Sequence, residues 1–292
     1  MEASLAKSQS AASAEHHAEN AQLSARLPEA DKMSLEAWEH DFKGTDKQVK
    51  VPIMLEGVKF DPLSTRSVLK ANDPVTSIYM QARESMGKVM TPDGFVGSGF
   101  FVDKDGLFST LYHVAENFKD MQVKTGDGQL HQAHLVSSDP ANDTVLLQVD
   151  KNDPQETFHT LKVGSFNDLK PGERVLACGF GVDPVLHCSP GKFDFTMKQK
   201  AIKLDLHPGE VAPPFDPERL LAHAEQHTVN GDSGGVEFRL SDGTVRMLVD
   251  MTDNKRNTVS IPADQLLSLE QKFRDQKTFQ NDVFPDKASS NA

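Results

Sequence analysis

A succession of short apolar runs, several of them closed by turn signals, constrains the fold of this chain more than any other feature. Such runs recur about every 8 to 12 residues after Gly87, a spacing typical of β-sandwiches and barrels. Because almost no helical periodicity interrupts them, the sequence predicts a mainly β fold, an antiparallel barrel or sandwich. The predicted strands cover 88–91, 95–102, 107–111, 121–124, 129–136, 144–149, 174–179, 193–206, 236–240 and 245–251.

Helical signals and polar segments flank the predicted strands. Pro74, preceded by a capping Asn-Asp pair, begins a short predicted helix, and a second helix fits 262–274. Residues 1–36 have few large apolar side chains and are expected to be disordered or loosely helical. The predicted organisation has three parts: a partly disordered N-terminal extension over 1–75, a folded domain over 76–275 and a polar C-terminal tail over 276–292.

Charge and hydropathy exclude several classes of partner. The 292 residues hold 31 Lys and Arg against 43 Asp and Glu, a formal net charge of −12, which argues against nucleic-acid or polybasic membrane binding. No run approaches the roughly 18 apolar residues of a membrane span, and the N-terminus lacks the apolar core of a signal peptide. We therefore expect a soluble chain without a membrane span. Its compartment stays open: if a signal peptide has been removed from this sequence, the protein is periplasmic or secreted.

Cys178 and Cys188 are the two cysteines, too few for a disulfide framework. We expect two reduced, half-buried thiols. The alternative is that they pair across a hairpin in an oxidising compartment.

The stretch from Asn230 to Gly235, Asn-Gly-Asp-Ser-Gly-Gly, is the first candidate for chemistry. A serine hydroxyl is a poor nucleophile, so Ser233 would need a histidine base, a group that orients the base, and donors for an oxyanion. The glycines let the backbone turn sharply and aim the N–H groups of Gly231 and Ser233 at one point. The motif alone is equally compatible with a surface turn.

A base and an acid precede this serine in the sequence. His113 lies at the end of the predicted strand 107–111, held by the sheet yet able to face a cleft. Asp143 lies at the mouth of the apolar strand 144–149, where a carboxylate can accept a hydrogen bond from imidazole and fix its tautomer. Asp139 is the rival, but its position inside a turn suits hydrogen bonding to the turn backbone.

Five segments, which include His113, Asp143 and Ser233, resemble segments of trypsin-like serine peptidases. The resemblance is greatest to the HtrA/Deg-type bacterial branch. The order His, Asp, Ser is the one associated with the chymotrypsin fold. The resemblance covers roughly 76–275 and implies a double six-stranded β-barrel, with His113 and Asp143 on the first barrel and Ser233 on the second. The segments are 97–102, 109–114, 142–147, 231–235 and 259–262.

The resemblance also implies a mechanism. Ser233 attacks a peptide carbonyl, His113 takes and returns the proton, and Asp143 orients the imidazole. The N–H groups of Gly231 and Ser233 hold the oxyanion. The expected partner is a protein or peptide substrate, and no metal or organic cofactor is required.

Three features depart from the family pattern. HtrA-type proteins usually carry a PDZ domain after the peptidase domain, and none is expected here. Asp232 matches the digestive branch, where its counterpart pairs with an N-terminus newly cut at an Ile-Val-Gly-Gly site, but no such site precedes Gly97. Either no such cleavage occurs or Asp232 has another partner. The family's usual glycine in the strand 245–251 is also absent.

Substrate preference is open at this stage. Counting back from Ser233 in the trypsin pattern places His227 near the base of the primary specificity pocket, with Asp250 and Thr252 on a wall. His227 favours an acidic or amide side chain, whereas a buried Asp250 favours a basic one. The bulk of Met251 and Thr252 would narrow the pocket, and the alternative is that these side chains point away from it.

The remaining histidines build no metal site. His131 and His134 are three apart on a predicted strand and should face opposite sides. His187 adjoins Cys188, but no second ligand pair occurs at zinc-like spacing. His16 and His17 are expected to be a solvated pair, and four more are expected on the surface or in packing: His40, His159, His207 and His223.

Two functions from different classes follow. The first is an active serine endopeptidase acting through an acyl-enzyme. The second is a peptidase-like scaffold that binds proteins without cutting them, its pocket closed by the N-terminal extension or by residues around Met251. Because all three catalytic residue types are present, we favour the enzyme. Homo-oligomers are common in the HtrA-type branch, which makes one an open expectation here.

Overall fold

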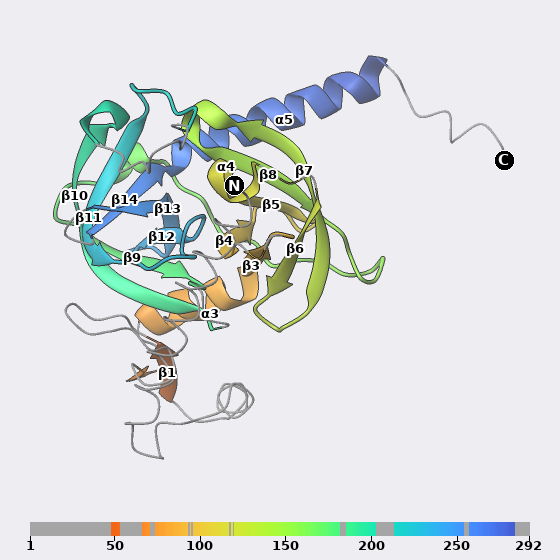
Figure 1. The fold of residues 1–292 in the computed structure, drawn as a ribbon. Coiled ribbons are helices and arrows are strands. Elements are labelled where there is room, and N and C mark those ends of the chain that lie inside the picture. The colour runs from red at the N-terminus through yellow and green to blue at the C-terminus, as the bar shows by residue number, and fades with distance from the viewer. Residues whose placement is uncertain are drawn as a thin grey trace, which may run out of the picture.

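Two closed β-barrels form the body of the molecule (Figure 1). The computed structural model describes residues 48–52, 66–70, 74–92, 94, 96–116, 118, 120–181, 185–202, 213–253 and 257–283. The first barrel has the strand order β3-β4-β5-β8-β7-β6 and the second the order β10-β11-β14-β13-β12-β9, with antiparallel neighbours throughout. This is the double barrel that the resemblance implied.

Each barrel contributes six strands of ordinary length. The first consists of β3 (Met86–Met90), β4 (Val96–Phe101), β5 (Leu107–Leu111), β6 (Asp120–Thr125), β7 (Leu130–Asp139) and β8 (Thr144–Val149). The second consists of β9 (Arg174–Gly179), β10 (His187–Lys198), β11 (Leu220–His227), β12 (Val236–Arg239), β13 (Thr244–Thr252) and β14 (Asn257–Pro262).

Large side chains fill the first barrel. Phe101 stacks on Phe158 with ring centroids 4.1 Å apart and meets Phe108 edge-on at 4.9 Å. Every residue of β5 is buried, because one face lines the barrel and the other is covered by neighbouring elements. A strand packed on both faces is held in place, which suits it to support a functional residue at its end.

Helices and short turns connect and cover the barrels. α5 (Ala263–Val283) packs against β7 and β8 of the first barrel and β13 and β14 of the second. None of the described helices has the length and apolar content that a membrane crossing requires. The smaller elements are α3 (Pro74–Ser85), α4 (Tyr112–Ala115), η2 (Pro140–Asn142), η3 (Phe166–Asp168), η4 (Gln199–Ala201) and the antiparallel pair β1 (Gln48–Pro52) and β2 (Arg66–Lys70).

The structure corrects the predicted elements in three places. The strand predicted over 193–206 ends at Lys198, where η4 follows, and α5 runs beyond 274 into the predicted tail. β11 was missed, because its sequence Leu-Leu-Ala-His-Ala-Glu-Gln-His is rich in residues with low strand preference and its buried positions do not alternate. The predicted disorder of 1–36 lies outside the described residues.

The two cysteines form a disulfide, which corrects the expectation of reduced thiols. Cys178 of β9 and Cys188 of β10 are direct cross-strand partners with Cα atoms 4.3 Å apart, and both are buried. The hairpin alternative was the right one, because the register places the two side chains opposite each other on one face.

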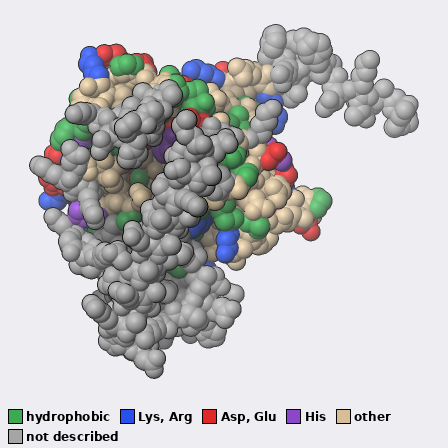
Figure 2. Space-filling view, viewed as in Figure 1, with side chains coloured by type: hydrophobic (Ala, Val, Ile, Leu, Met, Phe, Trp, Pro, Cys, Tyr) green, Lys and Arg blue, Asp and Glu red, His purple; other side chains and the backbone are tan. Residues whose placement is uncertain are grey.

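Figure 2 shows the outer surface of the face seen in Figure 1. Where side chains are coloured, basic and acidic groups are interspersed rather than gathered by sign. On this visible part of the surface, neither sign of charge forms a separate patch.

Candidate active site

His113 and Asp143 come together at one end of the first barrel. His113 lies in α4 directly after β5, and Asp143 lies between η2 and β8. The backbone N–H of Tyr112 donates to the carbonyl of Asp143 at 3.2 Å, which holds the two segments side by side. Asp143 is the one non-glycine residue in the described ranges with positive φ, 56°, a conformation that turns its side chain back toward α4.

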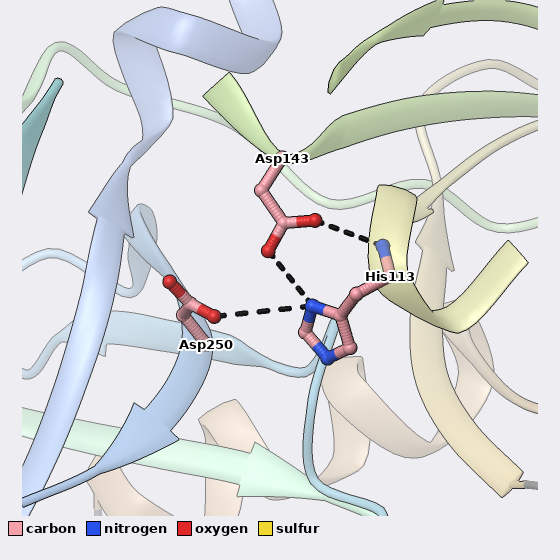
Figure 3. A group of neighbouring side chains, drawn as sticks. All are labelled: His113, Asp143 and Asp250. Atoms are coloured by element: carbon pink, nitrogen blue, oxygen red, sulfur yellow. Dashed lines mark hydrogen bonds and ion pairs between the residues drawn. The ribbon is translucent and has the colours of Figure 1, made fainter. Parts of the chain in front are cut away.

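Asp143 accepts two hydrogen bonds from His113 (Figure 3). Its Oδ2 lies 2.8 Å from Nδ1 of the ring, and its Oδ1 accepts the backbone N–H of His113 at 2.9 Å. Asp143 is fully buried, whereas the His113 side chain is 26% exposed. An imidazole that donates from Nδ1 to this carboxylate keeps Nε2 free to accept a proton. Asp139 instead caps η2 through Asn142, as expected of a turn residue.

A buried arginine joins this pair to a second carboxylate. Arg219 donates to Asp250 at 2.9 Å, and another of its nitrogens lies 3.7 Å from Oδ2 of Asp143. Its Nε donates to Gln199 at 2.9 Å. Nothing in the sequence near Arg219 signals this role, because the chain brings it to the site from a distant segment.

Asp250, which the trypsin pattern placed on a wall of the specificity pocket unless its side chain points away, lies beside His113 and Arg219. Its side chain is buried, pairs with Arg219 and has one oxygen 4.0 Å from Nδ1 of His113 (Figure 3). The reason is a register shift in β13: Val249 pairs with Ser260 and Met251 with Val259, which leaves Asp250 as the extra residue of a bulge. A bulge re-aims the side chain that alternation would have placed on the other face.

The charges around His113 alter its proton affinity. Burial lowers the pKa of His113, but the charge and hydrogen bond of Asp143, together with the charge of Asp250, outweigh burial and raise it to about 9. Burial and the neighbouring Asp143 raise the pKa of Asp250 above its ordinary value, against the opposing charges of Arg219 and His113. The imidazole therefore holds its proton more tightly than a free histidine, and Asp250 holds its proton more tightly than a free carboxyl group.

Ser233 lies in the loop between β11 and β12, held from both barrels. The Ser98 N–H donates to the Ser233 carbonyl at 2.8 Å, and the Ser98 hydroxyl donates to the Gly231 carbonyl at 2.8 Å. Gly234 has φ of +84°, and a Cβ there would lie 2.1 Å from the Ser98 carbonyl oxygen. Only glycine fits this approach between the barrels.

The Ser233 hydroxyl donates to the backbone carbonyl of Asp250 at 3.0 Å. No hydrogen bond joins it to His113 in the described part of the chain. Catalytic hydrogen bonds are often long or misaligned in unoccupied sites and tighten when substrate binds. Among the described residues, the serine and the histidine thus lie on facing barrels without a direct hydrogen bond between them.

The backbone N–H groups of Gly231 and Ser233 have no acceptor among the described residues. The N–H groups of Asp232, Gly234 and Gly235, by contrast, have backbone acceptors. These are the two groups that the sequence assigned to an oxyanion. A substrate oxygen near Ser233 would find both available.

The other predicted pocket residues lie at strand ends of the second barrel. The backbone N–H of His227 donates to Ser189 at 3.1 Å, and its ring is half-buried at the end of β11. Met251 is half-buried and Thr252 exposed at the end of β13. Their part in substrate preference stays a prediction.

The remaining histidines belong to separate environments. His131 is buried and His134 exposed, so the two face opposite sides as predicted. His223 is buried between Asp194 and Asp253, and His159 is exposed. His40 and His207 lie outside the described residues.

One cluster among the described residues has the composition of a metal site. The ligand atoms of His113, Asp143 and Asp250 lie within 4.8 Å of one another. Arg219 already supplies positive charge to both carboxylates there. The cluster thus has a cation of its own within the protein.

Comparisons with known proteins show which family and fold this chain is similar to. The family described as trypsin-like peptidase domain matches residues 97–246. A probable periplasmic serine endoprotease DegP-like of Pseudomonas fulva is 40% identical over 90 residues, 30% of this chain and 18% of that protein. Its counterpart in Pseudomonas fluorescens is 32% identical over 168 residues, 56% of this chain and 31% of that protein. The chain thus spans less than a third of the length of either relative.

Solved structures share the fold. A crystal structure of Rv3671c from M. tuberculosis, described as an inactive form, matches with a TM-score of 0.55 at 20% identity, covering 70% of this chain and 92% of that one. A second, described as the inactive form of the Rv3671c protease, matches with a TM-score of 0.55 at 21% identity, covering 67% and 92%.

Proposed function

The chain belongs to the trypsin-like peptidase family, and we propose that it is a serine endopeptidase that hydrolyses peptide bonds through His113, Asp143 and Ser233. The observation that carries the proposal is the pair of hydrogen bonds that Asp143 accepts from the ring and the backbone N–H of His113, at 2.8 and 2.9 Å. It fixes the tautomer in which Nε2 is the base. The free N–H groups of Gly231 and Ser233 support it from the other side of the site.

The proposed reaction is acyl transfer in two steps. Ser233 turns from the Asp250 carbonyl toward His113, and its oxygen attacks the peptide carbonyl carbon as Nε2 takes the hydroxyl proton. The N–H groups of Gly231 and Ser233 stabilise the oxyanion, and His113 returns the proton to the departing amine. Water then attacks the acyl-enzyme by the same route and releases the second product with Ser233 restored.

Labelling with a fluorophosphonate probe tests the nucleophile directly. We expect stoichiometric labelling of the intact chain, lost in Ser233→Ala and reduced by at least about a hundredfold in rate in His113→Ala, because the serine needs its base. Asp139→Ala, which removes the rival carboxylate, is the matched control. Once its fold is confirmed by circular dichroism, the probe should label it as it labels the parent chain. Absence of labelling in the intact chain would overturn the proposal and favour the binding scaffold.

The proposal extends to the compartment of the chain and to its class of substrate. The similar proteins are named as probable periplasmic serine endoproteases. The periplasm is an oxidising compartment, in which the Cys178–Cys188 disulfide is stable. We assign the chain to that compartment, with protein substrates. Mass spectrometry of the intact chain from its native host, with and without alkylation, reads the disulfide.

A further inference from the structure

Asp232, next to the nucleophile, is a buried carboxyl group whose partner the sequence left open. It is 2% exposed, and its Oδ2 accepts the backbone N–H of Val229 at 2.8 Å. The Asp232 N–H donates in turn to the Val229 carbonyl at 3.0 Å. The side chain and backbone of Asp232 thus close the turn that contains Gly231 and leads into Ser233.

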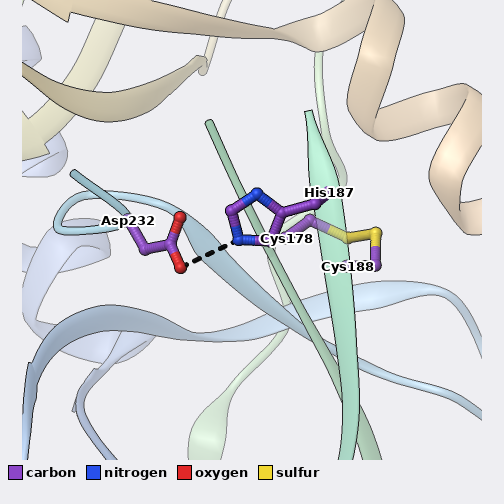
Figure 4. The surroundings of a disulfide bond; sticks show 4 residues. All are labelled: Cys178, His187, Cys188 and Asp232. Carbon is purple, nitrogen blue, oxygen red and sulfur yellow. Dashed lines mark hydrogen bonds and ion pairs between the residues drawn. A yellow bond between two sulfur atoms is a disulfide. The ribbon is translucent and has the colours of Figure 1, made fainter. Parts of the chain in front are cut away.

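His187 supplies the missing partner. Its Nε2 lies 3.1 Å from Oδ2 of Asp232, and both side chains are almost completely buried (Figure 4). Oδ1 of Asp232 has no hydrogen-bond partner within the described ranges. A buried carboxyl group is costly unless paired, so Asp232 depends on this one side-chain donor.

The surroundings leave Asp232 little freedom. A Cβ on Gly179 would lie 2.5 Å from Oδ1 of Asp232, so β9 approaches the carboxyl group as closely as glycine allows. Gly179 and His187 are direct cross-strand partners, and the Cys178–Cys188 pair beside them is joined by the disulfide (Figure 4). The strand that presents His187 is thereby fixed to the strand that touches Asp232.

We infer that His187 is a positioning residue for the oxyanion donors. By holding Asp232, it keeps the turn in the conformation in which the N–H groups of Gly231 and Ser233 are free for substrate. In this role it takes the place of an N-terminus released by cleavage, so this chain needs no such cleavage to arrange its site. The inference rests on the proposed peptidase function.

Steady-state hydrolysis of a peptide substrate by the full chain tests this role. We expect His187→Leu to lower kcat by about 10- to 100-fold with KM changed less than about threefold, because a displaced donor weakens only the transition state. His187→Gln retains an N–H donor near Nε2 and should restore kcat to within about threefold of the parent chain. His134→Leu removes an exposed, carboxylate-paired histidine of the first barrel and is the matched control.

A double-mutant cycle separates positioning from general destabilisation. If His187 acts through Asp232, His187→Leu should lower kcat little further in an Asp232→Asn background. Equal kcat in His187→Leu and the parent chain, or fully additive losses in the cycle, would overturn the inference. Should His187→Leu not fold, His187→Gln and Asp232→Asn decide: kcat of His187→Gln as low as that of Asp232→Asn also overturns it.

The two proposals fail in different ways. A parent chain that neither reacts with fluorophosphonate nor cleaves peptide removes the peptidase function and the inference with it. A parent chain that does both, alongside a His187→Leu variant of equal kcat, removes the inference alone.

Discussion

At the scale of single residues, the site differs from a bare His-Asp-Ser set in its density of charge. Two buried carboxyl groups face one imidazole, and one guanidinium lies against both. The sequence motifs predicted His113, Asp143 and Ser233 because each lies in a short local signature. They could not predict Arg219, which has no signature, or the orientation of Asp250, which depends on a bulge.

Substitution of Asp250 should move the pH profile. In the proposed mechanism His113 acts as a base only after losing its proton, so kcat/KM of the parent chain should rise with pH to a midpoint near 9. Asp250→Asn removes a negative charge 4.0 Å from Nδ1, which lowers the pKa of His113. We expect the midpoint to move to lower pH and kcat/KM at pH 7 to rise about 3- to 10-fold.

The control for this profile is Asp120→Asn, an exposed carboxylate on the first barrel. This variant should have the same midpoint of kcat/KM against pH as the parent chain. An unchanged or higher midpoint in Asp250→Asn would show that the Asp250 charge does not act on the base.

At the scale of elements, β12 carries a titratable group into the second barrel. Glu237 is fully buried and accepts hydrogen bonds from Gln226 of β11 and Ser260 of β14. Burial raises the pKa of Glu237 to about 7, although the two hydrogen bonds oppose it. Strand prediction placed β12 correctly, but a charged residue in a strand reads as solvent-facing, so its burial was not predictable from the pattern.

The raised pKa of Glu237 makes stability depend on pH. Because the folded value lies above the unfolded value of 4.5, the protonated form stabilises the fold fully below about pH 4.5, and this is lost as pH rises through 7. The loss amounts to about 3 kcal/mol. Glu237→Gln should abolish it and raise the free energy of unfolding at pH 8, since the Oε1 of Gln226, which has no partner among the described residues, can accept after its amide turns.

Urea unfolding at pH 5 and pH 8 measures this difference. The exposed neighbour on β11 provides the control variant Glu225→Gln, which should retain the parent pH dependence. A Glu237→Gln chain with the same loss of stability between the two pH values would contradict the prediction.

At the scale of the whole molecule, several contacts hold the barrels against each other. Ser98 of the first barrel bonds to both Gly231 and Phe180, and the Asp216 N–H donates to the carbonyl of Ala141 at 2.8 Å. α5 packs on strands of both barrels. Strand spacing predicted an antiparallel barrel or sandwich, and the resemblance to trypsin-like peptidases implied the double barrel, whereas these cross-barrel contacts are not visible in any local pattern.

Truncating a buried side chain of α5 should lower the stability of the whole fold. Leu266 is completely buried, so Leu266→Ala should lower the free energy of unfolding by about 2–5 kcal/mol by leaving a cavity. Denaturant unfolding followed by circular dichroism measures it, with the exposed Ser268→Ala on the same helix as control. A change below about 1 kcal/mol would mean that α5 is dispensable for holding the barrels.

The division of the site between barrels has a consequence for biosynthesis. His113 and Asp143 emerge with the first barrel, whereas Ser233 and Arg219 are contributed by the second. In the proposed mechanism, the first barrel completed during translation holds a base without a nucleophile. The proposed activity would begin only when the last strands have closed the second barrel, so the order of synthesis would delay proteolysis by the nascent chain.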